Sequence, residues 1–439
     1  MHLVFENVLK NLLQLWTGEY KGLNEGTEAY QLEPTVWEAI GVASAESGAT
    51  IPYAYGPRPP NVAASNVSWT ADTRSFWALY VGPVLLNGRF KRRRYYEHFV
   101  ALVRLILKCI QFEITHQEVD ELRAGFAQWV RDYEDIYYQH NPGRLSACPL
   151  TIHALLHIAD GILAAGPVWV AWAFPIERYC GALQPAIHSR RFPYASINRY
   201  VVDQARLTHI KIRFSAEDAL ALEPPSLDGF YGGICVTGYE GYSLLPSHRE
   251  TSFPRGLVDK IVACLMTRFE GRLTPATVRS ALPTTFDEWA RLRVGDDGDG
   301  DTIHTANFAQ RGTDDGRDAT FIRYEQLVDV YARQRRRASV YEKQTFYGRL
   351  LHVFTFRLAP LPSLGIHQET SLVLAAVRSC DVSETHPTLD IHYYEQDGAL
   401  EVIDVSTIRC LVGRVRDRGR WAIIDRSGAL ARGVYLEEQ

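Results

Sequence analysis

Glu177 is an isolated acidic residue that follows an apolar, tryptophan-rich run, VWVAWAF, at 168–174. The residue has two explanations. It is a candidate catalytic carboxylate. It is also an ordinary first-turn acid, favoured there by the helix macrodipole, with Arg178 beside it keeping the site in solvent. Taken alone, the residues favour the second explanation.

Two histidines, His153 and His157, lie four residues apart just upstream of this run. This spacing places both imidazoles on one face of a helix, where they can bind one metal ion such as zinc. No cysteine pair accompanies them, and only Cys148 is near in sequence. Without further ligands, the residues favour two histidines packed in a helical core over a metal site.

Basic residues gather in three places that could contact nucleic-acid phosphates or act as nuclear-localisation signals. The clusters are Lys91, Arg92, Arg93 and Arg94 followed by two tyrosines, Arg190 and Arg191 with Lys211 and Arg213, and Arg333 with Arg335, Arg336 and Arg337. A run of four basic residues is equally a solvated helix start. Because the whole chain carries a net charge of −4, nucleic-acid binding would rest on such local patches.

The first half of the chain has the periodicity of helices that would position these residues. Apolar spacing predicts helices over 1–16 and 97–112, and Thr115 with Glu118 forms a capping box that opens another helix ending near Tyr138. The next helix runs from His153 to about residue 164 and stops at Gly166. Pro175 suits the first turn of a further helix that would carry Glu177, while 168–174 fits a strand or a buried helix.

The second half changes character. Residues 192–294 are mixed, and 295–318 are rich in Asp and Gly, which predicts a solvated linker. Asp296, Asp297, Asp299 and Asp301 suggest a calcium loop, but no closing Glu or flanking helix pair supports it. Residues 319–439 are β-branched, aromatic and turn-punctuated, which predicts a separate β-rich domain, a small barrel. The predicted fold is therefore mixed α/β, with a largely α-helical part at 1–191.

Composition agrees with a folded protein of two or three domains: 439 residues, 46% apolar and 22% charged. The seven cysteines are scattered and never form Cys-x-x-Cys, which indicates reduced thiols in an intracellular protein. We expect neither a signal peptide nor a membrane span, so the Asn66-Val67-Ser68 sequon is an accident.

The stretch SACPLTIHALLHIADGILAAGPVWVAWAFPIERYCGALQPAIHSRRFPYASINRYVVDQA resembles the conserved region of Tnp2-type transposases of CACTA DNA transposons. The shared pattern is two histidines, Gly-Pro, an aromatic-Pro step and Glu-Arg-Tyr. The resemblance extends upstream through MHLVFENVLKNLLQLWTGEYKGLNEG and, more loosely, to YGRLLHVF, VIDVSTIRCLVGRV and WAIIDRSG near the end. It spans most of the chain.

This resemblance implies an RNase H-like core in which two aspartates and one glutamate hold two Mg²⁺ or Mn²⁺ ions, interrupted by a helical insertion. Glu177 matches the third acid. It also implies nuclear localisation, transposon-end DNA as partner, and a possible homo-oligomer. Related recombinases place a zinc site of two Cys and two His in the insertion; His153 and His157 match the His half, and the Cys-x-x-Cys half is missing.

In the family, Met-His follows the second catalytic aspartate after one residue, and here Met-His is Met1-His2. The resemblance thus predicts a fragment or remnant that lacks both aspartates and does not cut DNA alone. The alternative is a non-catalytic DNA-, chromatin- or protein-binding module that acts through the C-terminal β domain. An ordinary hydrolase has little support, because the sequence contains no nucleophile elbow, phosphate loop or complete ligand set.

Overall fold

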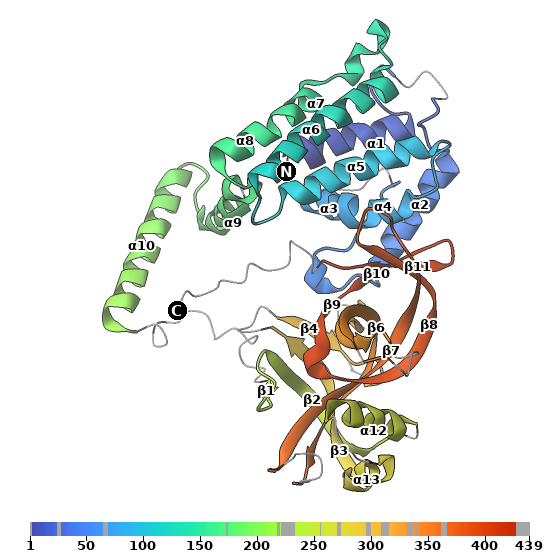
Figure 1. Ribbon diagram of the computed structural model, residues 1–439. Helices are drawn as coiled ribbons and strands as arrows, with labels where there is room; N and C mark the ends of the chain where they lie inside the picture. The colour runs from blue at the N-terminus through green and yellow to red at the C-terminus, as the bar shows by residue number, and fades with distance from the viewer. Residues whose placement is uncertain are drawn as a thin grey trace.

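The protein is mixed α/β, with helices in the first half and an antiparallel sheet in the second (Figure 1). The computed structural model describes residues 2–23, 28–64, 69–172, 174–216, 220, 233–254, 256–269, 274–295, 300–308, 316–331, 337–338, 340–360 and 367–426. Of residues 174, 175, 177 and 178 it describes the backbone only.

The first half contains ten α-helices among the described residues, joined by short π- and 3₁₀-helical turns. The helices are α1 (Leu9–Thr17), α2 (Pro34–Ser47), α3 (Ala71–Phe76), α4 (Gly82–Leu85), α5 (Arg93–Cys109), α6 (His116–Tyr133), α7 (Leu150–Ala154), α8 (Ile158–Ala165), α9 (Phe174–Leu183) and α10 (Pro193–Phe214). The turns are η1 (His2–Val8), η2 (Tyr53–Tyr55), η3 (Trp77–Val81), η4 (Glu134–Tyr138), η5 (Pro142–Ala147), η6 (Leu155–His157), η7 (Val168–Ala171) and η8 (Gln184–Ala186).

The predicted helix boundaries are largely confirmed. The capping box is present: the Thr115 hydroxyl accepts from the Glu118 amide at 3.3 Å, and the Glu118 carboxylate accepts from the Thr115 amide at 2.8 Å. Helix α6 continues through η4 to Tyr138, as predicted. The helix that carries the histidines begins earlier, at Leu150, and α8 stops at Gly166, whose φ of 86° is readily adopted only by glycine.

The second half forms one sheet in the order β1-β2-β3-β6-β7-β8-β11-β10, with β4 on β3 and with β5 between β6 and β9. Its strands are β1 (Ile234–Cys235), β2 (Tyr242–Ser252), β3 (Thr285–Val294), β4 (Asp301–His304), β5 (Phe321–Asp329), β6 (Tyr341–Leu358), β7 (Thr370–Thr385), β8 (Ile391–Asp404), β9 (Ile408–Leu411), β10 (Gly413–Asp417) and β11 (Arg420–Ile424). Helices α12 (Leu257–Arg268) and α13 (Pro275–Ala281) pack their apolar side chains against β6 and β7.

Strand pairing in this half follows a ring. It passes from β5 through β6, β7, β8 and β11 to β10, and only Val412 separates β10 from β9, which pairs back with β5. The Val412 amide also donates to the Phe321 carbonyl, at 2.9 Å, so the pairing continues across this residue. Figure 1 shows these strands curving around one another below the helices.

The sheet runs across the position of the predicted linker at 295–318. Strand β4 lies within this range and pairs with β3, and β3 pairs with β6 from the predicted C-terminal domain. The Asp301 carboxylate accepts from the Leu411 amide at 3.0 Å, which is a structural role rather than a solvated one. The sheet-containing part therefore begins near residue 234 instead of 319. Asp296, Asp297 and Asp299 lie outside the described residues.

The helical and strand halves share one hydrophobic core. Ile391, Tyr393, Val415 and Ile424 from the strands and Leu389, just before β8, pack in the same buried cluster as the helix side chains. The proline-rich segment that follows α2 makes the polar part of this junction, and it contains the short helical turn η2. The Tyr55 hydroxyl from this turn lies 2.8 Å from the Leu411 carbonyl oxygen and 3.2 Å from that of Ile424.

Arg414 is the most enclosed cation of the junction. Its guanidinium donates to the Tyr394 hydroxyl at 2.8 Å and to the Asp318 carboxylate at 2.9 Å. The guanidinium carbon lies 3.4 Å from the Phe321 ring centroid and 4.3 Å from that of Trp421. Only 9% of the residue is exposed. Hydrogen bonds and ring contacts together offset the cost of burying this charge.

Replacing Arg414 should destabilise the whole chain, because Asp318 would lose its cationic partner inside the junction. We expect Arg414→Ala to lower the free energy of unfolding by about 3 kcal/mol. The exposed Arg416, two residues along the same strand, is the matched control. Arg416→Ala should change the free energy of unfolding by less than about 0.5 kcal/mol. Urea denaturation checks both values, and equal effects would contradict the assigned role.

His98 is buried as a neutral side chain between helices α5 and α6. Its ring stacks on Trp129 with centroids 4.4 Å apart, and its Nε2–H donates to the Trp129 carbonyl at 3.2 Å. The Trp129 indole N–H donates in return to the His98 carbonyl at 2.9 Å. Burial lowers the pKa of His98 to about 4, although the hydrogen bond to the carbonyl acts in the opposite direction.

This pKa makes stability depend on pH. The unfolded chain takes up a proton on His98 near pH 6.5 and the folded chain near pH 4. The contribution of neutral His98 to the free energy of unfolding is therefore complete above pH 6.5. As the pH falls toward 4, this free energy decreases by about 3 kcal/mol. Chemical denaturation at several pH values should show His98→Phe losing less stability than the wild type over this range. Equal losses would mean that another group is responsible.

None of the described helices has the length and apolar character needed to cross a bilayer. All seven cysteines are free thiols, of which Cys109, Cys380 and Cys410 are buried while Cys180 and Cys235 are exposed.

Candidate functional site

Glu177 lies in the first turn of α9, as the Pro175 signal predicted. The structure describes its backbone but not its side chain. Across the described ranges, no three His, Cys, Asp or Glu side chains come together to hold a metal ion. The structure therefore gives the position of this candidate ligand in the fold and leaves its partners as a prediction.

The apolar run before α9 is not the buried strand or helix that the sequence suggested. It forms the 3₁₀ turn η7, with Trp169 43% exposed and Val170 55% exposed. The Trp169 indole N–H donates to the Phe112 carbonyl at 3.0 Å, and the two rings are 6.0 Å apart. This contact holds the run beside the C-terminal end of α5. The prediction is wrong because apolar composition alone does not distinguish a buried run from an exposed one.

His153 and His157 are both exposed, so the expectation that they pack in a helical core is wrong. The chain steps from α7 into the 3₁₀ turn η6 between them, and their Nε2 atoms lie 3.2 Å apart. Two nitrogens that share a tetrahedral zinc ion at about 2.0–2.1 Å lie roughly 3.4 Å apart. The separation of the two nitrogens is close to this value and equally fits a hydrogen bond between the two rings. Partial burial raises the pKa of the nearby Cys148 thiol, which disfavours the thiolate that zinc requires.

The basic run Lys91–Arg94 lies at the start of α5, with all four side chains exposed. Lys91 pairs with Glu33 at 2.9 Å, Arg93 pairs with Glu97 at 2.8 Å, and Arg94 lies over the Tyr95 ring. Arg92 is the N-cap residue. Cations at a helix N-terminus are unfavourable for the macrodipole, and these side chains remain reachable by a phosphate.

Arg190 and Arg191 lie in the turn between η8 and α10, and both are exposed. The guanidinium of Arg191 lies 5.4 Å from the Phe192 ring centroid. This turn and the run at Lys91–Arg94 do not form one patch. Trp169 of the segment before α9 contacts Phe112 beyond the C-terminal end of α5, while Lys91–Arg94 lies at the N-terminal end, roughly 25 Å away along 17 residues of helix.

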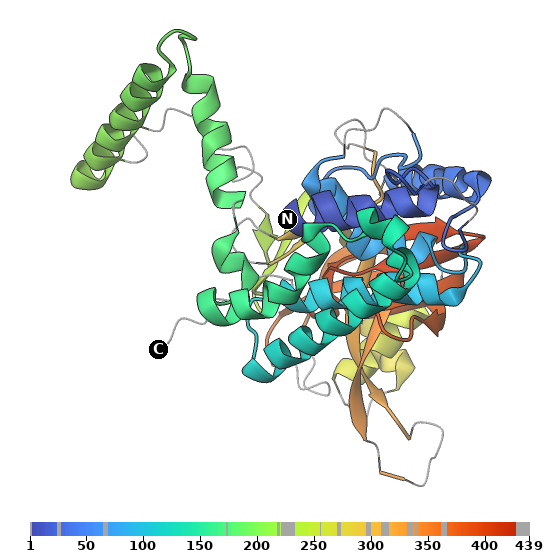
Figure 2. The same ribbon diagram turned by 90° about the horizontal axis from the view of Figure 1, so that it is seen from above.

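Helix α10 adds a feature that the sequence analysis missed. Arg199, Arg206 and Arg213 recur every seven residues, so they lie along one face. Arg199 and Arg206 lie 3.8 Å and 3.5 Å from Asp203, with side chains 88% and 74% exposed. The helix has no buried residue, and it stands away from the rest of the molecule in both views (Figures 1 and 2). The seven-residue spacing was visible in the sequence, but nothing there indicated an unpacked helix.

The segment 190–214 is strongly basic within an acidic protein. It contains six Lys and Arg residues against the single acid Asp203, which gives +5, whereas the whole chain carries −4. The third basic cluster gives less information, because Arg333, Arg335 and Arg336 lie outside the described residues. Arg337 lies over the Tyr331 ring, 4.8 Å from its centroid.

No protein-family model matches the sequence, and no curated protein matches it.

The histidine pair should bind zinc weakly, since two ligands leave half of the coordination sphere to water. We expect isothermal titration calorimetry to show one weak Zn²⁺ site that is lost in both His153→Ala and His157→Ala. His140→Ala, which removes an exposed histidine paired with Asp135, should leave it unchanged. Tight binding would indicate further ligands and a complete zinc site, and binding unaffected by both substitutions would exclude the pair.

Proposed function

We propose that this chain is part of a CACTA-type, Tnp2-like transposase that acts on DNA in the nucleus, and that the chain alone binds transposon-end DNA without cutting it. The observation that carries the proposal is the sequence of elements around Glu177. An acid in the first turn of α9 is followed, after η8, by the exposed turn of Arg190 and Arg191 and then by the arginine face of α10. Along the chain, a metal-ligand candidate therefore precedes exposed cations of the kind that suits phosphate contacts.

The proposed reaction is two-metal phosphoryl transfer. A pair of Mg²⁺ or Mn²⁺ ions activates the attacking oxygen and stabilises the leaving oxygen, and one carboxylate cannot hold such a pair. Glu177 would supply one ligand, and the resemblance assigns the other two to the aspartates of the RNase H-like core. The role proposed for this chain is to contribute Glu177 and to bind DNA.

Two finer features of the fold belong to the same proposal. We infer that the first helices and α9 correspond to an RNase H-like core remnant with its helical insertion. We also infer that the ring of pairings from β5 back to β9 is a small barrel. In such a barrel β9 pairs with β5 and β10 pairs with β11, and closure of this kind is a common solution to exposed strand edges.

The alternative is a non-catalytic module that binds DNA, chromatin or a protein through the strands after residue 319. The shared core argues against independent action of those strands, because their apolar residues are buried by the helices and β3 pairs directly with β6. A homo-oligomer is compatible with either function.

DNA binding provides the direct test. Replacing Arg199, Arg206 and Arg213 together with Gln should flatten the dependence of log K on log salt by about 0.9 for each lost phosphate contact. Fluorescence anisotropy with duplex DNA between about 50 and 200 mM salt measures this slope. The control variant replaces three exposed arginines elsewhere, Arg104, Arg131 and Arg357, and thus changes the net charge equally.

If the slope changes equally in both triple variants, the loss of net charge alone explains the change. That outcome would contradict a specific role for α10 in DNA binding. In the same assay, Glu177→Ala should leave binding in the absence of divalent metal unchanged. Cleavage of DNA by the purified chain with Mg²⁺, abolished in Glu177→Ala, would show that the chain is active alone and overturn that part of the proposal.

A further inference from the structure

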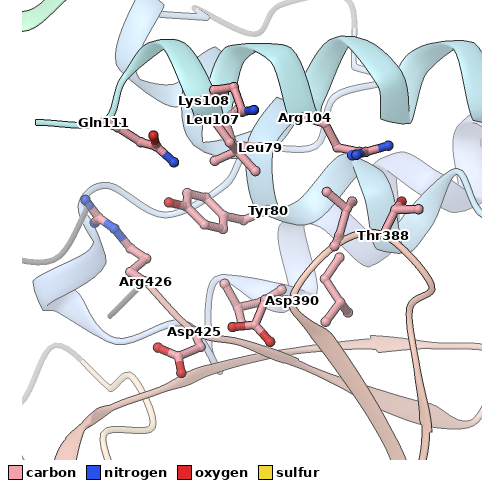
Figure 3. Close-up of a pocket in the computed structure, with 13 residues that line it drawn as sticks. Leu79, Tyr80, Arg104, Leu107, Lys108, Gln111, Thr388, Asp390, Asp425 and Arg426 are labelled. Atoms are coloured by element: carbon pink, nitrogen blue, oxygen red, sulfur yellow. The ribbon is translucent and has the colours of Figure 1, made fainter. Parts of the chain in front are cut away.

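A cavity of about 330 Å³ opens at the junction of the helical and strand halves (Figure 3). One wall is the C-terminal part of α5, where Arg104, Leu107 and Lys108 follow the three- and four-residue spacing of one helix face, together with Gln111 just after the helix. Leu79 and Tyr80 of η3 lie beside them. The opposite wall is formed by 388–391 and by 424–426. This volume is within the range of small-molecule sites.

The cavity has an apolar centre. Leu79, Leu389, Ile391 and Ile424 line it and are each less than a tenth exposed, and Leu107 is half-buried. In Figure 3 the side chains of Gln111, Tyr80 and Arg426 lie on one side of the cavity, and those of Arg104 and Thr388 lie on the other. The guanidinium, amide and hydroxyl groups of the first three side chains all carry N–H or O–H donors.

The carboxylates of the cavity already have partners. Asp425 accepts from Arg323 at 3.1 Å with its side chain only 1% exposed, and Asp390 accepts from His392 at 2.8 Å. The Arg323 charge offsets that of Asp425, whereas Asp390 keeps its negative charge on the wall opposite α5. Arg426 is held in place: it donates to the Tyr55 carbonyl at 2.9 Å and lies over the Tyr55 ring. A cation fixed in advance loses little entropy when it binds an anion.

We infer that this cavity binds a small amphipathic anion, an aromatic or short aliphatic group bearing one acidic group. The apolar part occupies the centre against Leu107 and Ile391, and the acidic group accepts hydrogen bonds from Arg426, Tyr80 and Gln111. This site is independent of DNA binding and of Glu177. It lies where the helical and strand halves meet, so a bound ligand contacts both and stabilises their association.

The test uses the full chain and a pair of probes that differ in one group. Anilinonaphthalene sulfonate carries the anion, and phenylnaphthylamine is the same ring system without it. We expect fluorescence titration to give one sulfonate site that is weakened about tenfold in Arg426→Gln and in Tyr80→Phe. Phenylnaphthylamine should bind both variants as it binds the wild type. Leu107→Trp fills the centre and should abolish binding of both probes.

Arg104→Gln is the matched control, because it removes an equal charge from the far side of the cavity, and it should change sulfonate affinity by less than threefold. Thermal unfolding of each variant verifies the fold, and Tyr80→Phe, which keeps the ring, decides the outcome if Arg426→Gln unfolds. Equal binding of both probes to the wild type, equal loss in Arg104→Gln and Tyr80→Phe, or full binding by Leu107→Trp would each overturn the inference.

Discussion

The structure depends on the contact between the segment after α2 and the strands β9–β11. Thr50 and Arg414 bind each other through two hydrogen bonds, from the Arg414 amide to the Thr50 carbonyl at 3.0 Å and from the Thr50 hydroxyl to the Arg414 carbonyl at 2.5 Å. The Asp318 amide donates to the Ala49 carbonyl at 2.8 Å. The Arg414 side chain extends from this contact into the junction, where it binds Asp318 and Tyr394. One short segment of the first half thus fixes the last strands, and the helices cover them.

Local signals predicted the helices well because they depend on neighbouring residues. The capping box at Thr115 and the stop at Gly166 involve contacts within four residues, and both appear in the structure. The short, turn-punctuated runs after residue 319 likewise predicted strands. What the sequence could not give was the extent of the sheet, because pairing of β3 with β6 joins residues more than sixty positions apart. Strand β4 was not predicted either, because residues 295–318 have the Asp- and Gly-rich composition of a linker and β4 is a strand through its pairing with β3.

The candidate sites show the same division. The four-residue spacing of His153 and His157 predicted that their rings meet, which they do, but composition alone could not tell an exposed face from a buried one. Likewise, the exposure of Trp169 and the isolation of α10 depend on what the rest of the chain leaves uncovered. The cavity beside Tyr80 and Arg426 could not be predicted from the sequence, since its lining comes from four segments spread over residues 79–426.

The distance in sequence between Thr50 and Arg414 has a consequence for synthesis. The two residues are 364 positions apart, and a ribosome adds roughly 5–20 residues each second. The helices therefore emerge roughly 20–70 s before the strands that cover their apolar face. During that interval the nascent chain exposes the surface later buried by Tyr393 and Ile424, a surface that chaperones bind and on which chains aggregate.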